Sequence, residues 1–271
     1  NKYILEDKLY VRDFTNYDCI PVDLNQLTSF EDQNVFIENE MNNFQRKYSE
    51  FELNKHEKII IVNDGYGFQE KHLLLSQVDK DVCIIAVNGA LKEWRLIKKI
   101  SGLERSVNYY LVNNPYEECK NYIPENHSYY PKCIASTRTN SDFLNLYKGN
   151  KHLYSPTPNN SFSSLFDYKL KVDDYRNVIC AGLDISFKFN ASKIFLYCCD
   201  DSFEKNKPGS ISMENGLRCY PQQLISEKII GNMCYWLKNK NIEIYNYSNG
   251  NIINNTTQLK NDEEFLTALS T

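Results

Sequence analysis

Short apolar runs recur along the chain, and each is bounded by polar or turn residues. The runs predict buried strands because they are apolar or β-branched and too short for ordinary helices. They cover residues 58–62, 82–87, 108–112, 193–199 and 242–247. Stretches with a different periodicity separate several of them, which indicates that strands and helices alternate.

The clearest helical pattern covers residues 222–238. Its apolar side chains recur about one turn apart and are Ile225, Ile229, Met233 and Trp236. A second pattern covers residues 177–189, and Asp173 or Asp174 is placed to cap its entry. Strand, helix and strand at these spacings predict an α/β fold, namely a Rossmann-like, mostly parallel sheet with helices on both faces, over residues 55–250.

The flanking and intervening segments carry weaker patterns. Residues 1–54 show no clear strand alternation, but residues 36–51 have helical spacing, which predicts an N-terminal helical extension. Residues 251–271 are expected to form a C-terminal tail. Residues 125–168 are rich in Pro, Ser, Asn and Tyr, and they predict an irregular, lid-like segment that is mobile without ligand.

Composition narrows the classes of function. The chain has 271 residues and is 42% hydrophobic, so it can bury a large core. Its net charge is −4 and its Lys and Arg residues are scattered, which argues against a nucleic acid polymer as partner. No run approaches the roughly 18 apolar residues of a membrane span, and the first residues lack the order of a signal peptide. We therefore expect a soluble, cytoplasmic protein, whose nine cysteines are reduced.

Polar residues and glycines follow three successive predicted strands. They are Asp64, Gly65, Gly67, Asn88, Gly89, Asn113 and Asn114. Parallel strands bring such ends to one edge of a sheet, where glycine amides can approach a phosphate and asparagines suit base edges and ribose hydroxyls. The segment "NDGYG" matches neither GxGxxG nor a P-loop, so tight structural turns remain the alternative to a nucleotide site.

The motifs "IIIVNDGYGF", "IIAVNGA", "YYLVNNPYEE" and "SKIFLYCCDDSF" resemble those of the MptE-like superfamily over residues 58–250. That group includes the motility accessory factor glycosyltransferases and archaeal 6-hydroxymethylpterin diphosphokinases, and it is similar in layout to bacterial lipooligosaccharide sialyltransferases. The resemblance implies that Gly65, Asn88, Asn114 and Asp200 surround a cytidine nucleotide donor. Tyr66 and Gly67 stand where the phosphate loop of the family has Pro-Ser.

The catalytic residues implied by the resemblance are Asp200, Arg218 and Tyr220. Asp200 closes an apolar strand, so its carboxylate must face a polar cleft or a partner. Arg218 and Tyr220 precede the last long helix, where they would stabilise charge on the leaving nucleotide. The histidine expected there as base is missing, which leaves His127 and His152 as candidates.

The sequence thus predicts a sialyltransferase-like, nucleotide-sugar-dependent glycosyltransferase that acts on a surface glycan or protein acceptor. A CMP-sugar is the favoured donor, and no bound cofactor or metal is expected. Two alternatives remain open. One is an MptE-like, ATP-dependent diphosphokinase on a pterin-type alcohol, although the acidic metal ligands of that group are missing. The other is a non-catalytic nucleotide- or glycan-binding relative.

Overall fold

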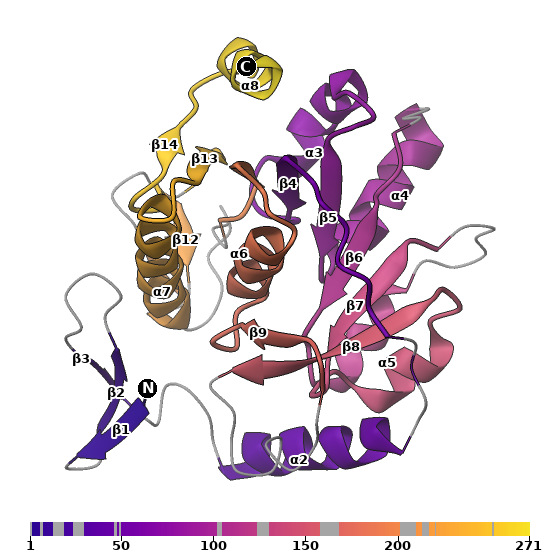
Figure 1. Ribbon diagram of the computed structural model, residues 1–271, viewed down its shortest axis with the longest axis vertical. Coiled ribbons are helices and arrows are strands. Elements are labelled where there is room, and N and C mark those ends of the chain that lie inside the picture. Colours follow the sequence, from indigo (N-terminus) through magenta and orange to yellow (C-terminus); the bar gives the residue numbers. More distant parts are fainter. Residues whose placement is uncertain are drawn as a thin grey trace.

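Nine parallel strands form the main sheet in the part of the chain that the structure, a computed structural model, describes (Figure 1). The described residues are 2–5, 8–12, 19–23, 30–45, 48, 50–101, 105–123, 130–157, 168–200, 210–212, 217–219, 221–250 and 252–271. The strands are β4 (Lys58–Val62), β5 (Cys83–Val87), β6 (Tyr109–Val112), β7 (Lys132–Ser136), β8 (Lys151–Thr157), β9 (Lys171–Asp173), β10 (Lys193–Tyr197), β13 (Glu243–Tyr247) and β14 (Thr257–Gln258). Their order across the sheet is β14-β13-β10-β4-β5-β6-β7-β8-β9.

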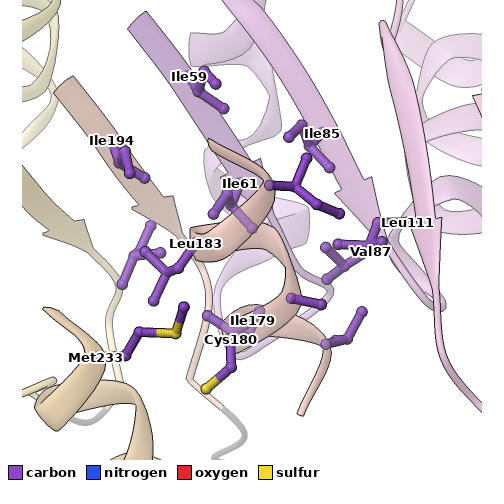
Figure 2. Close-up of a cluster of buried hydrophobic side chains, with 14 of the residues drawn as sticks. Ile59, Ile61, Ile85, Val87, Leu111, Ile179, Cys180, Leu183, Ile194 and Met233 are labelled. Atoms are coloured by element: carbon purple, nitrogen blue, oxygen red, sulfur yellow. The ribbon is translucent and has the colours of Figure 1, made fainter. Parts of the chain in front are cut away.

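Helices cover both faces of this sheet. On one face lie α3 (Phe68–Lys71), η1 (His72–Gln77), α4 (Ala90–Ser101), η2 (Glu117–Tyr122), α5 (Ser141–Leu146) and α8 (Asp262–Ser270). On the other face lie α6 (Val178–Lys188) and α7 (Pro221–Lys238). Figure 2 shows Leu183 of α6 and Met233 of α7 packed over β4, β5 and β10. The predicted fold class is confirmed.

The strands are apolar at nearly every position because both faces of the sheet are buried. Successive side chains point to opposite faces, so Ile60 and Val62 join one core while Ile59 and Ile61 join the other. All four are completely buried. This arrangement explains why the strands appear in the sequence as continuous apolar runs rather than as alternating patterns.

The chain reverses its direction of travel across the sheet at β4. From β4 it proceeds strand by strand to β9, and it then returns to place β10 on the other side of β4. The gap between the carboxyl ends of β4 and β10 is therefore the topological switch point, where open α/β sheets bind ligands. The fold places residues 63–67 and 198–200 at this point.

The α6 helix is capped differently from our expectation. Asn177 is the cap, because its side-chain oxygen accepts hydrogen bonds from Ile179 N and Cys180 N. Asp174 instead accepts hydrogen bonds from Arg176 N and from the Tyr154 hydroxyl. The helix nevertheless occupies almost the predicted range.

The N-terminal part contains more than the predicted helix. Helix α2 (Phe30–Phe44) confirms the helical extension. Ahead of it, β1 (Lys2–Leu5), β2 (Lys8–Arg12) and β3 (Cys19–Asp23) form a small antiparallel sheet that was not expected. Their charged residues interrupt the apolar alternation, and an antiparallel register that pairs Lys8 with Asp23 is not visible in one strand alone.

The expectation of an irregular lid over residues 125–168 is wrong for residues 130–157. These form β7, α5 and β8 inside the sheet, and Cys133, Ile134 and Tyr154 are completely buried. Polar residues hid the pattern because they are buried through hydrogen bonds, as when the Tyr147 hydroxyl donates to Pro131 O at 2.6 Å. Residues 125–129 and 158–167 lie outside the described residues.

The C-terminal segment is not a tail. Strand β14 extends the sheet by pairing with β13, and α8 buries Phe265 completely. The Phe265 ring stacks on that of Tyr247, with centroids 5.0 Å apart. Residues 252–271 therefore belong to the same domain.

Candidate functional site

The loop after β4 opens into a pocket of about 420 Å³ at the switch point. Its lining residues are Asp64, Gly65, Tyr66, Gly67, Phe68, Glu70 and Glu93. Three of the residues predicted to bind nucleotide therefore line one pocket. The lining includes three carboxylates and no Lys, Arg or His.

Gly65 allows two strand-end loops to meet. Its amide donates to Cys198 O at 3.1 Å, and an added Cβ would lie 2.3 Å from Cys198 O and 2.2 Å from Asp200 O. Gly67 has φ +83, and an added Cβ there would lie 2.7 Å from Asn249 Nδ2. The Gly65 amide is thus engaged within the protein and does not point at a ligand. Helix α3, with four residues, is also too short to present a strong dipole to a phosphate.

Asp64 lies against the start of α4. A Cβ added at Gly89 would come within 2.4 Å of Asp64 Oδ2, so only glycine leaves room for this carboxylate. Asp64 is exposed on its pocket side, but partial desolvation by the protein raises its pKa above the ordinary value, and the negative charge of Glu93 raises it further. Carboxylates so placed accept hydrogen bonds from hydroxyl or amino groups, whereas they repel an unaccompanied phosphate.

The asparagines join neighbouring strand ends. Asn88 has φ 41, and its side-chain oxygen accepts a hydrogen bond from Asn113 N at 3.4 Å. Asn114 Nδ2 donates to the Tyr122 hydroxyl, and Asn114 Oδ1 accepts from Tyr116 N, both at 2.9 Å. The predicted residues after β5 and β6 are therefore adjacent to each other, and their side chains shape the loops.

Asp200 lies at the β10 side of the switch point. Its side chain is buried, and the Ser248 hydroxyl donates a hydrogen bond to its carboxylate. It is not among the residues that line the pocket, although its carbonyl oxygen lies next to Gly65. Asp200 thus links the ends of β10 and β13.

A lysine near this point was missed by the sequence interpretation. Lys71 Nζ lies 3.6 Å from the centre of the Tyr247 ring, at the end of β13. Burial lowers the pKa of Lys71, while the negative charges of Asp262 and Asp200 oppose that effect. No sequence motif marks Lys71, because the strands that surround it come from distant parts of the chain.

The remaining catalytic candidates are less well placed or fall outside the description. Arg218 begins β12 (Arg218–Cys219), which pairs with β11 (Ile211–Ser212), but its side chain and the whole of Tyr220 lie outside the described residues. His127 lies outside them too. His152 is near the amino end of β8 and packs on Phe51, with ring centroids 5.1 Å apart, so it is remote from the carboxyl edge.

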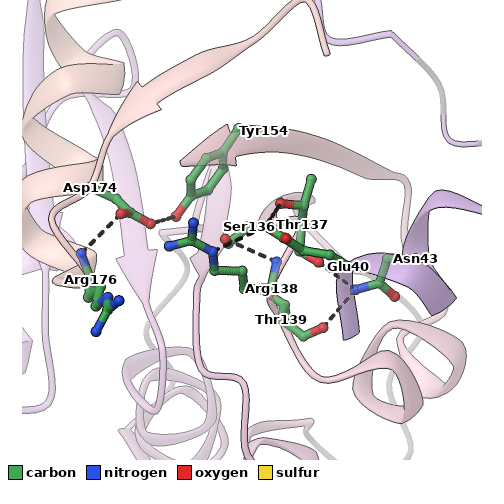
Figure 3. Close-up of polar contacts among 9 residues, drawn as sticks. All are labelled: Glu40, Asn43, Ser136, Thr137, Arg138, Thr139, Tyr154, Asp174 and Arg176. Carbon is green, nitrogen blue, oxygen red and sulfur yellow. Dashed lines mark hydrogen bonds and ion pairs between the residues drawn. The ribbon is translucent and has the colours of Figure 1, made fainter. Parts of the chain in front are cut away.

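A second polar cluster lies at the ends of β7 and β9, with Tyr154 of β8 between them (Figure 3). Its members come from α2 and from the strand-end loops, and they are Glu40, Asn43, Ser136, Thr137, Arg138, Thr139, Tyr154, Asp174 and Arg176. Arg138 is 7% exposed and Glu40 is 1% exposed. The segment "STRT" follows a strand just as "NDGYG" does, but the expectation of an irregular lid over residues 125–168 concealed it.

The described residues also bear on metal sites, membrane spans and the state of the cysteines. No group of three or more His, Cys, Asp or Glu side chains among them is arranged to hold a metal ion. In the same residues, no helix has the length and apolar character needed to cross a bilayer. Seven cysteines have described side chains, and all seven are free and buried.

Comparison with known proteins gives a likeness in fold. No family model matches the chain, and no curated protein matches it. Among solved structures, the chain is similar to a MAf glycosyltransferase from Magnetospirillum magneticum AMB-1, with a TM-score of 0.67 and 14% sequence identity. The match covers 90% of this chain and 42% of that protein, so the chain spans less than half of its length. The shared fold agrees with the layout that the strand motifs predicted.

Proposed function

We propose that the chain is a nucleotide-sugar-dependent glycosyltransferase whose donor binds at the switch point between β4 and β10. The observation that carries the proposal is the pocket of about 420 Å³ at this point. The fold shared with a MAf glycosyltransferase supports it, as does the resemblance of the strand-end motifs to that superfamily.

The acidic lining supports an arrangement of the donor in which the nucleoside lies beside the carboxylates. Asp64 and Glu93 would accept hydrogen bonds from hydroxyl or amino groups of the nucleoside, as a carboxylate does for ribose in other dinucleotide-binding sheets. The phosphates would lie away from these carboxylates, on the β10 and β13 side. Lys71 is the described cation there, and it would stabilise the charge that develops on the leaving nucleotide.

Our proposal for the donor, the reaction and the acceptor follows the resemblance of the strand-end motifs to that superfamily. The positions of Gly65, Asn88, Asn114 and Asp200 favour a CMP-sugar as donor and a sialyltransferase-like reaction on a surface glycan or protein acceptor. The acceptor hydroxyl must lose a proton, either to a protein base or to the departing phosphate. Arg218 and Tyr220 remain candidates for stabilising the leaving group. No resident cofactor or metal is required by this scheme.

A ligand screen tests the proposal. Thermal shift and calorimetry would compare CMP-, UDP- and GDP-sugars with ATP in the presence and absence of Mg²⁺. We expect a CMP-sugar to raise the melting temperature with a concentration dependence that fits one site, and to release CMP when acceptor glycans are added. Stabilisation by ATP only with Mg²⁺ would favour the diphosphokinase. Binding of a nucleotide or glycan without any turnover would favour the non-catalytic relative, and no response to any nucleotide would refute the donor site.

A further inference from the structure

Helix α2 meets the sheet through a mainly polar face. Among its described residues, the buried side chains recur at helical spacing, and they are Phe36, Asn39, Glu40 and Asn43. Met41 and Phe44, by contrast, are 49% and 50% exposed. A helix that serves only to cover a core normally buries its apolar stripe and exposes its polar residues. The opposite arrangement indicates that α2 is held by specific polar contacts.

The hydrogen bonds of Asn39 and Asn43 in α2 reach the loops after β6 and β7 and the start of α5. Asn39 Nδ2 donates to Pro115 O at 2.9 Å. Asn43 Nδ2 donates to Thr137 O at 3.0 Å and to Thr139 O at 2.8 Å. Each such hydrogen bond contributes only about 1 kcal/mol net, because water replaces it when the helix leaves. Apart from Phe36, the described buried side chains that α2 would expose on leaving this edge are polar.

Glu40 occupies the centre of this contact as a carboxylate held on one side. Arg138 Nε donates to Glu40 Oε1 at 3.1 Å, and the Thr137 hydroxyl donates to the same oxygen at 3.3 Å. Glu40 Oε2 is buried and has no hydrogen-bond partner among the described residues. Burial raises the pKa of Glu40 although Arg138 opposes the shift. Arg138 thus already binds one carboxylate oxygen, and Glu40 is an incomplete ligand for it because only one of its two oxygens is paired.

A second arginine borders the same place. The guanidinium groups of Arg138 and Arg176 lie 5.7 and 5.2 Å from the centre of the Phe36 ring. Tyr175 and Arg176 have φ values of 44 and 62, a strained backbone of the kind found at ligand sites. Without Glu40, the cluster in Figure 3 would hold two arginines and Asp174 as its remaining carboxylate, which leaves a surplus of positive charge.

We propose that Arg138, Thr137 and Arg176 form an oxyanion-binding subsite at the ends of β7 and β9, and that Glu40 of α2 fills it as an internal competitor. Its ligand is the phosphate or carboxylate group of a substrate. Binding of that group displaces Glu40, and α2 leaves the edge of the sheet. The subsite lies beyond the switch-point pocket and does not depend on the identity of the sugar donor.

The test uses the full chain with inorganic pyrophosphate and succinate as probes. Glu40→Gln keeps the hydrogen-bond acceptor for Arg138 but removes the competing charge. We expect calorimetry to show about tenfold or tighter binding of at least one probe to this variant than to the unmodified chain, because a charged acceptor is bound more strongly than a neutral one. The probe that gains identifies the source of the oxyanion as phosphate or carboxylate.

Two matched variants locate the effect. Glu38→Gln changes an exposed glutamate of the same helix and should leave the affinity for both probes unchanged. Adding Arg176→Gln to Glu40→Gln should remove most of the gain, and Arg176 is exposed, so the fold should survive its replacement. Hydrogen exchange should show α2 losing protection when the probe binds, while β4 and β5 keep theirs.

The outcomes separate this proposal from a structural ion pair. Equal affinity of the Glu40→Gln and Glu38→Gln proteins for both probes would overturn it, as would a gain that persists after Arg176→Gln. Exchange of α2 that does not change with bound probe would overturn the displacement. A nucleotide screen without any response would not affect these measurements, so the two proposals fail separately.

Discussion

Two regions of the carboxyl edge differ in their charged residues. At the switch point, the pocket beside Asp64 is open and lined by carboxylates. At β7 and β9, Arg138 and Arg176 form a basic cluster, and Glu40 of α2 covers it. One edge of a parallel sheet thus offers an acidic pocket for hydroxyl-rich groups and a basic one for an oxyanion. A substrate with a sugar and a charged group would be oriented by this separation of charge.

The two regions also differ in how they are held. The loops at the switch point are joined by backbone contacts such as Gly65 N to Cys198 O, which cannot be separated without distorting the sheet. The basic cluster is closed by side chains of a helix outside the sheet. We therefore expect rigidity at the first region and movement at the second.

The largest effect should come from Gly65→Val. The new Cβ would lie within 2.3 Å of two backbone oxygens, which cannot move as a side chain can. We expect a loss of more than about 3 kcal/mol of unfolding free energy, at the upper end for overpacked sites, measured by urea denaturation. Gly182→Ala is the control, because the nearest atoms to its Cβ all belong to the Ile61 side chain, with Cδ1 at 3.0 Å. Similar stability of the two variants would mean that the loops at the switch point are not rigid.

Arg138→Met should destabilise the protein nearly as much, but the effect should be confined to α2 and the cluster around Arg138. It leaves Glu40 buried without its cation, which costs about 3 kcal/mol when a buried pair is broken from one side. We expect hydrogen exchange to show loss of protection in α2 while the strands of the sheet remain protected. The double variant Glu40→Met with Arg138→Met removes both charges and should recover most of the protection. Unfolding of the whole sheet by Arg138→Met would contradict the separation of the two regions.

Asp64→Asn should weaken nucleotide binding without loss of stability. Asp64 is exposed to solvent, so the neutral amide should change the stability at neutral pH by little. Loss of a charged acceptor for a donor hydroxyl should reduce affinity about tenfold, or about 1.4 kcal/mol. Calorimetry with the best nucleotide from the screen checks the affinity. Asp79→Asn, an exposed change, serves as control, and equal affinities would place the nucleoside elsewhere.

The central sheet could be predicted because its strands are buried on both faces. Runs such as residues 58–62 carry no polar residue beyond their first, so hydrophobicity alone locates them. Strand β8 could not be found this way, because it contains His152 and Ser155 and is buried through contacts with segments far along the chain. The same holds for β1, β2 and β3, whose pairing is not local.

The candidate site could be predicted only for the residues that directly follow apolar strands. The sequence indicated that residues after β4, β5 and β6 meet, and the contact of Asp64 with Gly89 and that of Asn88 with Asn113 agree with this. It did not indicate that the Gly65 amide is already engaged, nor that Lys71 or the Glu40 and Arg138 pair lie at the same edge. These facts depend on distances between elements that are far apart in the chain.

The smallest expected effect is a pH dependence of α2 docking that Glu40→Gln removes. The pKa of Glu40 is raised above its ordinary 4.5 in the folded protein by burial, and Asp174 adds to the shift while Arg138 and Thr137 oppose it. A carboxyl group with a raised pKa binds its proton more tightly in the docked state, so docking is favoured below pH 4.5 and weakens as the pH rises through the raised pKa.

Hydrogen exchange of α2, measured across this range, should therefore show protection that falls with rising pH once the intrinsic exchange rate is corrected for. The Glu40→Gln protein should show a flatter profile, and Glu38→Gln should keep the original one. Asp64 allows the response of the switch point to pH to be compared with that of α2. Its pKa is also raised, but its loop is joined to its neighbours by backbone contacts. Its titration should alter nucleotide affinity and leave the protection of β4 unchanged, whereas an equal response of α2 and β4 to pH would mean that the two regions open together.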